Sequence, residues 1–356
     1  MTVDALELRR VVLPLVAPFR SATDVHTTVE KLLVRAVTPD AAGWGECPVG
    51  LGPGSLDSID GVWAALRDGP IDASSLPAPA AAAVDTALLD TELRAAGTSL
   101  ASQLGAVRDA VDAGVAVGIA PSVGELLDEV ERHVAEGYRR VKLKIEPGWD
   151  VEPVAAVRER FGGDLALHVD GNGAYQIGDA EHLARLDPFG LLMLEQPLRV
   201  DDLDGHAELA RRVRTPICLD ESIASEADLE RALAVGACSI VNVKAARLGG
   251  LRAAVRVHDR CVQHRVPVWC GGMLETGVGR AANVALAALP GFTLPGDLSA
   301  SDRYFETDLT APFVLDDGCL VVPDGPGIGV DPRPDVLDEY TVAAATAPPP
   351  NVLRCE

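Results

Sequence analysis

The sequence predicts an α/β protein in which a small N-terminal α+β domain precedes a closed β/α barrel. From about residue 114, strand-like apolar runs alternate with helix-like segments, and about eight such units follow one another. Before that point, predicted strands are followed by predicted helices without alternation. An open doubly wound sheet is the alternative fold, but the sequence has no G-x-G-x-x-G or P-loop motif to support it.

The N-terminal region predicts two strands and two helices. Residues 5–15 and 29–48 are the strands, the second reaching a turn near Asp40, and a polar loop lies between them. Residues 56–69 and 77–97 are the helices, and the second is rich in Ala, the strongest helix former.

The barrel region predicts strands and helices in strict alternation. Its first helix opens with the capping box Ser122–Glu125 and ends at Gly137. The expected strands are 114–120, 138–145, 165–170, 191–197, 216–222, 239–245, 266–272 and 292–297. The expected helices are 122–137, 151–162, 179–187, 201–213, 225–236, 250–265 and 276–289.

Composition limits the partners of this protein. The net charge of −22 argues against nucleic acid or an anionic membrane, because either requires a basic surface. The seven cysteines include no C-x-x-C pair, which favours free thiols in a reducing compartment over a zinc site. Because the sequence shows no signal-peptide pattern and no long apolar run, we expect a cytoplasmic protein. We also expect a homo-oligomer.

Charged residues end five successive predicted strands. Asp170, Glu195, Asp220 and Lys244 follow one another at intervals of 24 or 25 residues, and Lys144 lies 26 residues before Asp170. This interval is the length of one strand–helix unit, so the same structural position recurs. Since barrel active sites lie at the carboxyl ends of the strands, we expect these side chains at one mouth.

Each of these residues alone has an ordinary explanation. A K-x-K pair is usually a solvated strand edge, and an Asp after an apolar run is usually a helix N-cap. The common interval favours a functional site instead. A barrel that binds a carboxylate ligand without catalysis remains a different class of function, although five charged positions together argue against it.

Three carboxylates at one mouth predict a metal ion. They cannot all remain ionised without a cation among them, and oxygen ligands favour Mg²⁺, with Mn²⁺ as the second choice. Asp170, Glu195 and Asp220 are the expected ligands. The metal and the lysines would give this acidic protein a local positive site for a small-molecule carboxylate substrate.

The lysines predict proton abstraction next to a carboxylate. A metal stabilises the enediolate that forms when the α-proton leaves. Lysine is a poor base at its usual pKa of about 10.4, but Lys142 on the same strand face should lower the pKa of Lys144 by like-charge repulsion.

Several motifs resemble the enolase superfamily, in particular its muconate-lactonizing subgroup. They are "KLK" at residues 142–144, "HVDGN" at 168–172, "LEQP", "CLDES" and "VNVKAARLGG". The resemblance implies a modified (β/α)7β barrel over 106–309 and a capping domain over 1–105. It also implies that residues 310–345 pack back on the capping domain. The last residues, "TAPPPNVLRCE" at 346–356, predict a loose tail.

The resemblance also assigns roles. It implies Asp170, Glu195 and Asp220 as ligands of Mg²⁺, Lys144 as the acid/base on one substrate face, and Lys244 as the cation or second base on the other. Lys142 would tune Lys144. Supporting residues would be Asn172 and Glu221. The mandelate-racemase subgroup needs a His after the seventh strand, where this chain has "WCGGMLET", so that subgroup is disfavoured.

Residues 269–309 resemble the branch of o-succinylbenzoate synthases and N-succinylamino acid racemases. Of the two activities the sequence favours the first, a carbon–oxygen lyase step of menaquinone biosynthesis that converts 2-succinyl-6-hydroxy-2,4-cyclohexadiene-1-carboxylate to 2-succinylbenzoate. Racemisation of N-succinylamino acids is the alternative, and both activities in one enzyme are also open. The N-terminal loops "FRSATDVHTT" and "GLGPGSLDSID" lack the pattern expected of relatives, so they leave the preferred acyl or ring group open.

Overall fold

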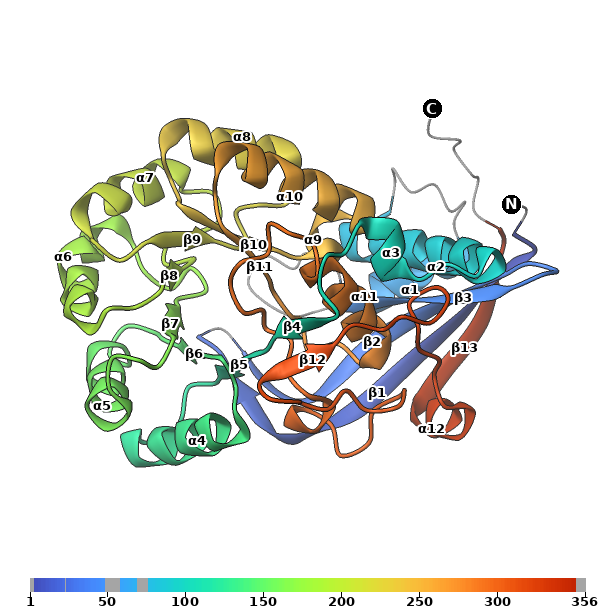
Figure 1. Cartoon of the computed structure of the whole chain (residues 1–356), viewed down its shortest axis with the longest axis horizontal. Helices are drawn as coiled ribbons and strands as arrows, with labels where there is room; N and C mark the ends of the chain where they lie inside the picture. Colours follow the sequence, from blue (N-terminus) through green and yellow to red (C-terminus); the bar gives the residue numbers. More distant parts are fainter. Residues whose placement is uncertain (1–2, 23, 49–57, 69–75, 350–356) are drawn as a thin grey trace.

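The structure, a computed structural model, describes residues 3–22, 24–48, 58–68 and 76–349. It divides into an antiparallel sheet with its own helices and a curled parallel sheet surrounded by helices (Figure 1). This architecture agrees with the α/β barrel and capping domain that the sequence predicts.

The capping sheet has the order β13-β1-β2-β3 and is antiparallel. One face packs against α1 and α2, where Leu8, Leu32 and Val34 are buried. Gly43 and Gly45 let β3 approach α2 closely, since a Cβ at either would overlap the backbone of that helix. Its elements are β1 (Ala5–Arg20), β2 (Val25–Val37), β3 (Ala42–Pro48), α1 (Ile59–Asp68), α2 (Ala78–Ala96), α3 (Leu100–Leu104) and β13 (Thr341–Ala347).

The C-terminal part of the chain returns to this sheet. β13 pairs with β1 from Leu6↔Ala347 to Val11↔Thr341, after α12 (Pro334–Tyr340). Residues 346 and 347, expected at the start of a loose tail, belong to this strand, and residues 350–356 lie outside the described part of the chain.

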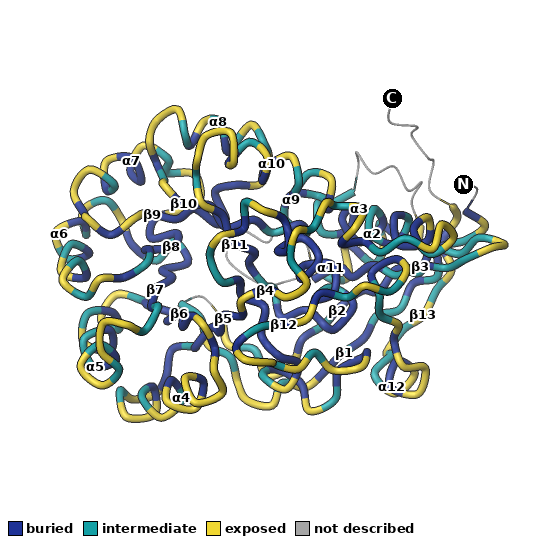
Figure 2. The backbone as a smooth tube through the Cα atoms, in the orientation of Figure 1, coloured by how far each residue is buried: buried dark blue, intermediate teal, exposed yellow. Residues whose placement is uncertain are grey.

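The barrel sheet is parallel and seven-stranded, in the order β11-β10-β9-β8-β7-β6-β5. Its strands lie inside and its helices outside, so the strands are buried, while most of the helices expose one side and α11 is buried along nearly its whole length (Figure 2). The strands are β5 (Gly114–Val117), β6 (Arg140–Lys144), β7 (Leu167–Asp170), β8 (Leu194–Glu195), β9 (Ile217–Leu219), β10 (Ile240–Val243) and β11 (Val268–Cys270). A separate pair joins β4 (Ala110–Asp112) to β12 (Cys319–Val321).

The crossover helices follow the predicted order. They are α4 (Val123–Glu136), α5 (Val151–Phe161), α6 (Ala180–Leu183), α7 (Leu203–Arg212), α8 (Glu226–Val235), α9 (Ala245–Leu248), α10 (Leu251–His264) and α11 (Gly277–Ala287). The Ser122 hydroxyl accepts from the Glu125 amide at 3.2 Å, which confirms Ser122 as the N-cap, and the Glu125 carboxylate accepts from that hydroxyl at 3.1 Å. Gly137 ends α4 with φ of 94°, as predicted.

Two predicted elements are irregular. The expected helix at 179–187 is a short α-helix flanked by 3₁₀ turns, η1 (Ile177–Asp179) and η2 (Ala184–Phe189), the second containing Pro188. The expected strand at 292–297 is not a regular strand. Pro295 has no N–H to donate, yet Phe292 bridges to Val268 and Gly296 to Ala113, so this segment closes the barrel between its two edge strands.

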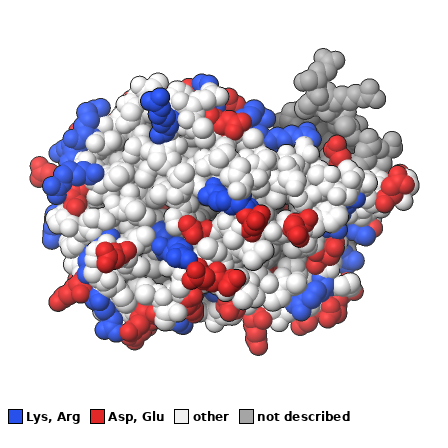
Figure 3. Space-filling model, in the orientation of Figure 1, with Lys and Arg blue, Asp and Glu red and all other residues white. Residues whose placement is uncertain are grey.

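On the face shown in Figure 3, acidic and basic side chains are interspersed. Among the described residues, no helix has the length and apolar character needed to span a membrane.

Candidate active site

The predicted site residues lie together at the carboxyl ends of the barrel strands. Lys144 on β6 pairs in register with Asp170 on β7, and Asp170 pairs with Glu195 on β8. Glu195 pairs with Cys218 of β9, whose continuation carries Asp220, and Lys244 directly follows β10. The equal spacing in sequence therefore corresponds to neighbouring positions on one edge of the sheet.

Lys142 and Lys144 both point into the barrel, and the same oxygen of Asp170 contacts both. The distances from that oxygen to the two ammonium nitrogens are 3.4 and 2.6 Å, so two like charges lie close together as the K-x-K spacing predicts. Lys142 also contacts Glu195 at 3.2 Å and forms an ion pair with Asp297. Burial lowers the pKa of Lys142, but the three carboxylates outweigh it and raise that pKa well above its ordinary value.

Asp220 lies between two cations. Its carboxylate accepts from Lys244 at 2.7 Å and forms an ion pair with Arg247. Burial alone would raise the pKa of Asp220, but Arg247 and Lys244 together hold it below its ordinary value. For Lys244, burial lowers the pKa and Asp220 raises it, with a net increase.

Glu195 is completely buried beneath these groups. Asn242 donates to it at 2.8 Å, and the His168 ring lies 3.2 Å from its other oxygen. Burial is the main cause that lowers the pKa of His168 far below its ordinary value, which favours a neutral ring.

Asn172 and Glu221 link the two sides of the site. Asn172 accepts from Lys144 at 2.7 Å and donates to Glu221 at 3.1 Å. Burial, reinforced by Asp220, raises the pKa of Glu221 to about 7, and its second oxygen is buried without a hydrogen-bond partner.

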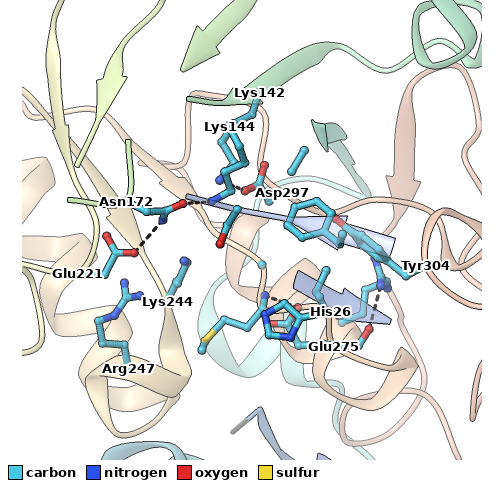
Figure 4. A pocket seen from close by; sticks show the side chains of 17 residues that line it. His26, Lys142, Lys144, Asn172, Glu221, Lys244, Arg247, Glu275, Asp297 and Tyr304 are labelled. Atoms are coloured by element: carbon cyan, nitrogen blue, oxygen red, sulfur yellow. Dashed lines mark hydrogen bonds and ion pairs between the residues drawn. The ribbon is translucent and has the colours of Figure 1, made fainter. Parts of the chain in front are cut away.

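A cavity of about 740 Å³, partly open to solvent, lies above these residues. Lys144 and Lys244 reach it from different strands, and groups of the capping domain and of the last barrel segment lie across from them (Figure 4). Its lining includes Lys142, Lys144, Asn172, Glu221, Lys244, Arg247, Glu275, Arg280, Asp297 and Tyr304 from the barrel side, and Phe19, Ser21 and His26 from the capping domain.

Comparisons with known proteins identify the family of this chain. The family described as "Enolase C-terminal domain-like" matches residues 125–336. A relative from an Amycolatopsis species, named N-succinylamino acid racemase, is 56% identical, with 96% of this chain and 98% of the relative aligned. One from Geobacillus stearothermophilus, named o-succinylbenzoate synthase, is 42% identical over 96% of each chain. A crystal structure of an enolase superfamily member from Listeria innocua matches with a TM-score of 0.90 and 35% identity, covering 98% of this chain and 99% of that one. The chain belongs to the enolase superfamily.

The donor chemistry of the site fits the divalent cation that members of the enolase superfamily use. Asp170, Glu195 and Asp220 lie at the ends of neighbouring strands, next to Glu221, and their carboxylate oxygens are the donors that a hard divalent cation prefers. One oxygen of Glu221 is buried without a hydrogen-bond partner. As the side chains stand, Asp170 and Asp220 contact lysines, and no three His, Cys, Asp or Glu groups in the described residues are arranged around one ion position. Asp170, Glu195 and Asp220 remain the predicted ligands.

Sequence reasoning missed several residues of this enolase-superfamily site. Asp297 is the last residue of the expected strand 292–297, but it lies outside the series of charged residues at the common interval, so that series did not identify it. His168 and Arg247 lie within quoted motifs, and their place beside a carboxylate-bearing strand end could have identified them. Of the two N-terminal loops, the first contributes Phe19, Ser21 and His26, while residues 49–57 lie outside the described part of the chain.

Proposed function

We propose that this protein racemises N-acylated α-amino acids, with N-succinylamino acids as the substrate class, by moving the α-proton between Lys144 and Lys244. The observation that carries this proposal is the pair of lysines that enter one cavity from β6 and from the end of β10, with three strands between them. The relative that is 56% identical and named N-succinylamino acid racemase supports this activity over the synthase that the sequence favours.

The reaction needs one lysine neutral and the other charged. The neutral amine takes the α-proton, and the electron pair of the C–H bond remains on the substrate as an enediolate. The opposite ammonium returns a proton to the other face, which inverts the α-carbon without net gain or loss of atoms. Lys144 is oriented by Asp170 and Asn172, whereas Lys244 is oriented by Asp220, so the two proton carriers are held independently.

A divalent cation held by Asp170, Glu195 and Asp220 would supply the positive charge that stabilises the enediolate of the substrate carboxylate. The chain supplies Lys142 and Arg247 around the same position. These groups concentrate positive charge at one place in a protein whose net charge is −22.

Dehydration to o-succinylbenzoate is the second candidate. Relatives that are 42% and 41% identical carry the name o-succinylbenzoate synthase. The same site would serve, because this elimination needs one base on one face, and Lys144 could also protonate the departing hydroxyl. Lys244 would then act as a cation beside the ring.

The decisive experiment compares kcat/KM for the two reactions. Racemisation of N-succinyl-phenylglycine is followed by polarimetry, and dehydration by ultraviolet absorbance. We expect racemisation to be faster by tenfold or more, about 1.4 kcal/mol in transition-state terms. Lys144→Ala should abolish both reactions, whereas Lys244→Ala should abolish racemisation and spare part of the dehydration. A dehydration rate tenfold higher would reverse our order, and no turnover with either substrate would favour a binding protein.

A further inference from the structure

Lys31 is a completely buried lysine on β2 of the capping sheet, outside the set of groups that line the cavity. Its ammonium group donates to the carbonyl of Met273 at 2.8 Å, across 242 residues of sequence. Met273 belongs to the segment that follows β11, at the mouth of the barrel. A residue of one domain thus holds the backbone of the other where the cavity wall begins.

The segment held in this way, residues 271–275, contacts one of the two proposed proton carriers. Gly271 packs so closely that a Cβ there would lie 2.5 Å from Cε of Lys244. Leu274 has φ of 53°, in the left-handed region that a leucine rarely adopts, so this backbone needs outside support. Residues 272–275 line the cavity.

Two buried carboxylates complete this junction. Glu46 on β3 accepts from the Thr276 hydroxyl at 2.6 Å and from the Gly279 amide at 3.0 Å. Glu275 accepts from the Met273 amide at 2.8 Å, which closes the segment on itself. Burial lowers the pKa of Lys31 and raises that of Glu46 to about 7, while each acts on the other in the opposite direction. We call Lys31, Glu46 and Glu275 the junction cluster.

The described part of the capping domain reaches the other proton carrier less directly, because Arg20 at the end of β1 forms a partly exposed ion pair at 2.8 Å with Glu146, two residues after Lys144. Lys144 is oriented by Asp170 and Asn172, both within the barrel. Removal of Lys31 should therefore disturb the two lysines unequally. A displacement of a reacting group by about 1 Å can cost a factor of about 10² in rate.

We propose that Lys31 is a positioning residue for Lys244: it holds the Met273 carbonyl, keeps residues 271–275 packed against the Lys244 side chain, and so makes proton transfer on that substrate face depend on docking of the capping domain. The inference rests on the proposed two-lysine function. It concerns one half of the reaction, the half in which Lys244 exchanges the proton.

The test is exchange of the α-proton in D₂O, followed by NMR for each enantiomer of N-succinyl-phenylglycine separately. Lys144→Ala and Lys244→Ala identify the enantiomer whose proton each lysine removes, since each variant should lose exchange with one enantiomer only. Lys31→Met should then slow the half-reaction of Lys244 by about 10- to 100-fold and that of Lys144 by less than roughly threefold.

Two further variants keep the result interpretable. The double variant Lys31→Met with Glu46→Gln removes both charges, so it leaves no unpaired buried carboxylate. It replaces Lys31→Met in the test if the single variant does not fold. Arg35→Met removes another cation of β2, one that pairs with Glu7 at 3.0 Å, and should leave both half-reactions unchanged.

The outcomes separate the inference from the function on which it rests. Suppose that each alanine variant loses exchange with one enantiomer only, but that Lys31→Met, or its double variant, slows both half-reactions equally or slows neither. The inference is then wrong, and the proposed function stands. If the alanine variants do not split by enantiomer, the two-lysine mechanism fails and the inference fails with it.

Discussion

This protein contains two buried clusters of lysines and carboxylates that differ in what surrounds them. The strand-end cluster, at the barrel mouth, comprises Lys142, Lys144, Lys244 and their carboxylates, and it faces a cavity. The junction cluster, between the domains, ties its groups to the backbone, since Lys31 donates to a carbonyl and Glu46 and Glu275 accept from amides. Of its three members, Glu275 also lines the cavity.

The difference shows how the same residue types acquire different roles. A buried charge bonded to backbone groups fixes the relative position of the elements that carry it, and its bonds are satisfied without a ligand. In the strand-end cluster the lysines share carboxylates among themselves, and next to it one oxygen of Glu221 has no partner. Such a cluster can accept a cation and a substrate without breaking the fold.

Metal removal should have the largest effect, confined to the strand-end cluster. Treatment with a chelator should lower kcat by a factor of at least about 10², because positive charge at the enediolate is lost. Addition of Mg²⁺ or Mn²⁺ should restore it. Asp220→Asn should weaken the binding of Mg²⁺, measured by calorimetry, by at least about tenfold.

The junction cluster supplies the control for this experiment. Glu46→Gln should retain the affinity of the wild-type protein for Mg²⁺, because Glu46 bonds to Thr276 and Gly279 and not to the strand ends. Full activity after exhaustive chelation would rule out the metal assignment. Equal loss of metal affinity in both variants would remove the distinction between the clusters.

The second prediction concerns pH and the junction cluster alone. Burial raises the pKa of Glu46 from 4.5 to about 7 in the folded protein. Between these values the folded state binds more protons than the unfolded state, so this group makes the free energy of unfolding fall as pH rises. Glu46→Gln removes that contribution. From pH 5 to 8, the wild type should lose up to roughly 3 kcal/mol relative to the variant, measured by urea unfolding. A difference between the two proteins that stays constant with pH would contradict the prediction.

Much of the barrel could be predicted because the sequence signals of its strands and helices lie within short segments of the chain. Period-2 apolar runs and helix caps such as Ser122 lie within a few residues of one another, and the strand-end charges recur at one interval. That interval was sufficient to group Asp170, Glu195 and Asp220, which the structure brings to one edge of the sheet.

The rest depends on contacts between distant parts of the chain. Lys31 meets Met273 across the domain junction, and Asp297 meets Lys142, which lies 155 residues earlier in the chain. A lysine in an otherwise apolar strand gives no indication of its partner. Sequence reasoning also placed residues 346–347 in a tail, because their pairing with β1 is specified by the opposite end of the chain.

The smallest predicted effect comes from a substitution far from both clusters, which serves as a control for them. Ser122 caps α4 on the outside of the barrel, where its hydroxyl accepts from the Glu125 amide at 3.2 Å. Ser122→Ala should lower the free energy of unfolding by about 1 kcal/mol, the usual cost of a lost N-cap. Both exchange half-reactions and the affinity for Mg²⁺ should stay at wild-type values, because α4 supplies none of the charged groups of either cluster. A change in the ratio of the two half-reaction rates in Ser122→Ala would show that a modest loss of stability is enough to alter that ratio. The unequal effect of Lys31→Met would then reflect a general loosening of the fold. The distinction between a cluster that positions and a cluster that reacts would no longer hold.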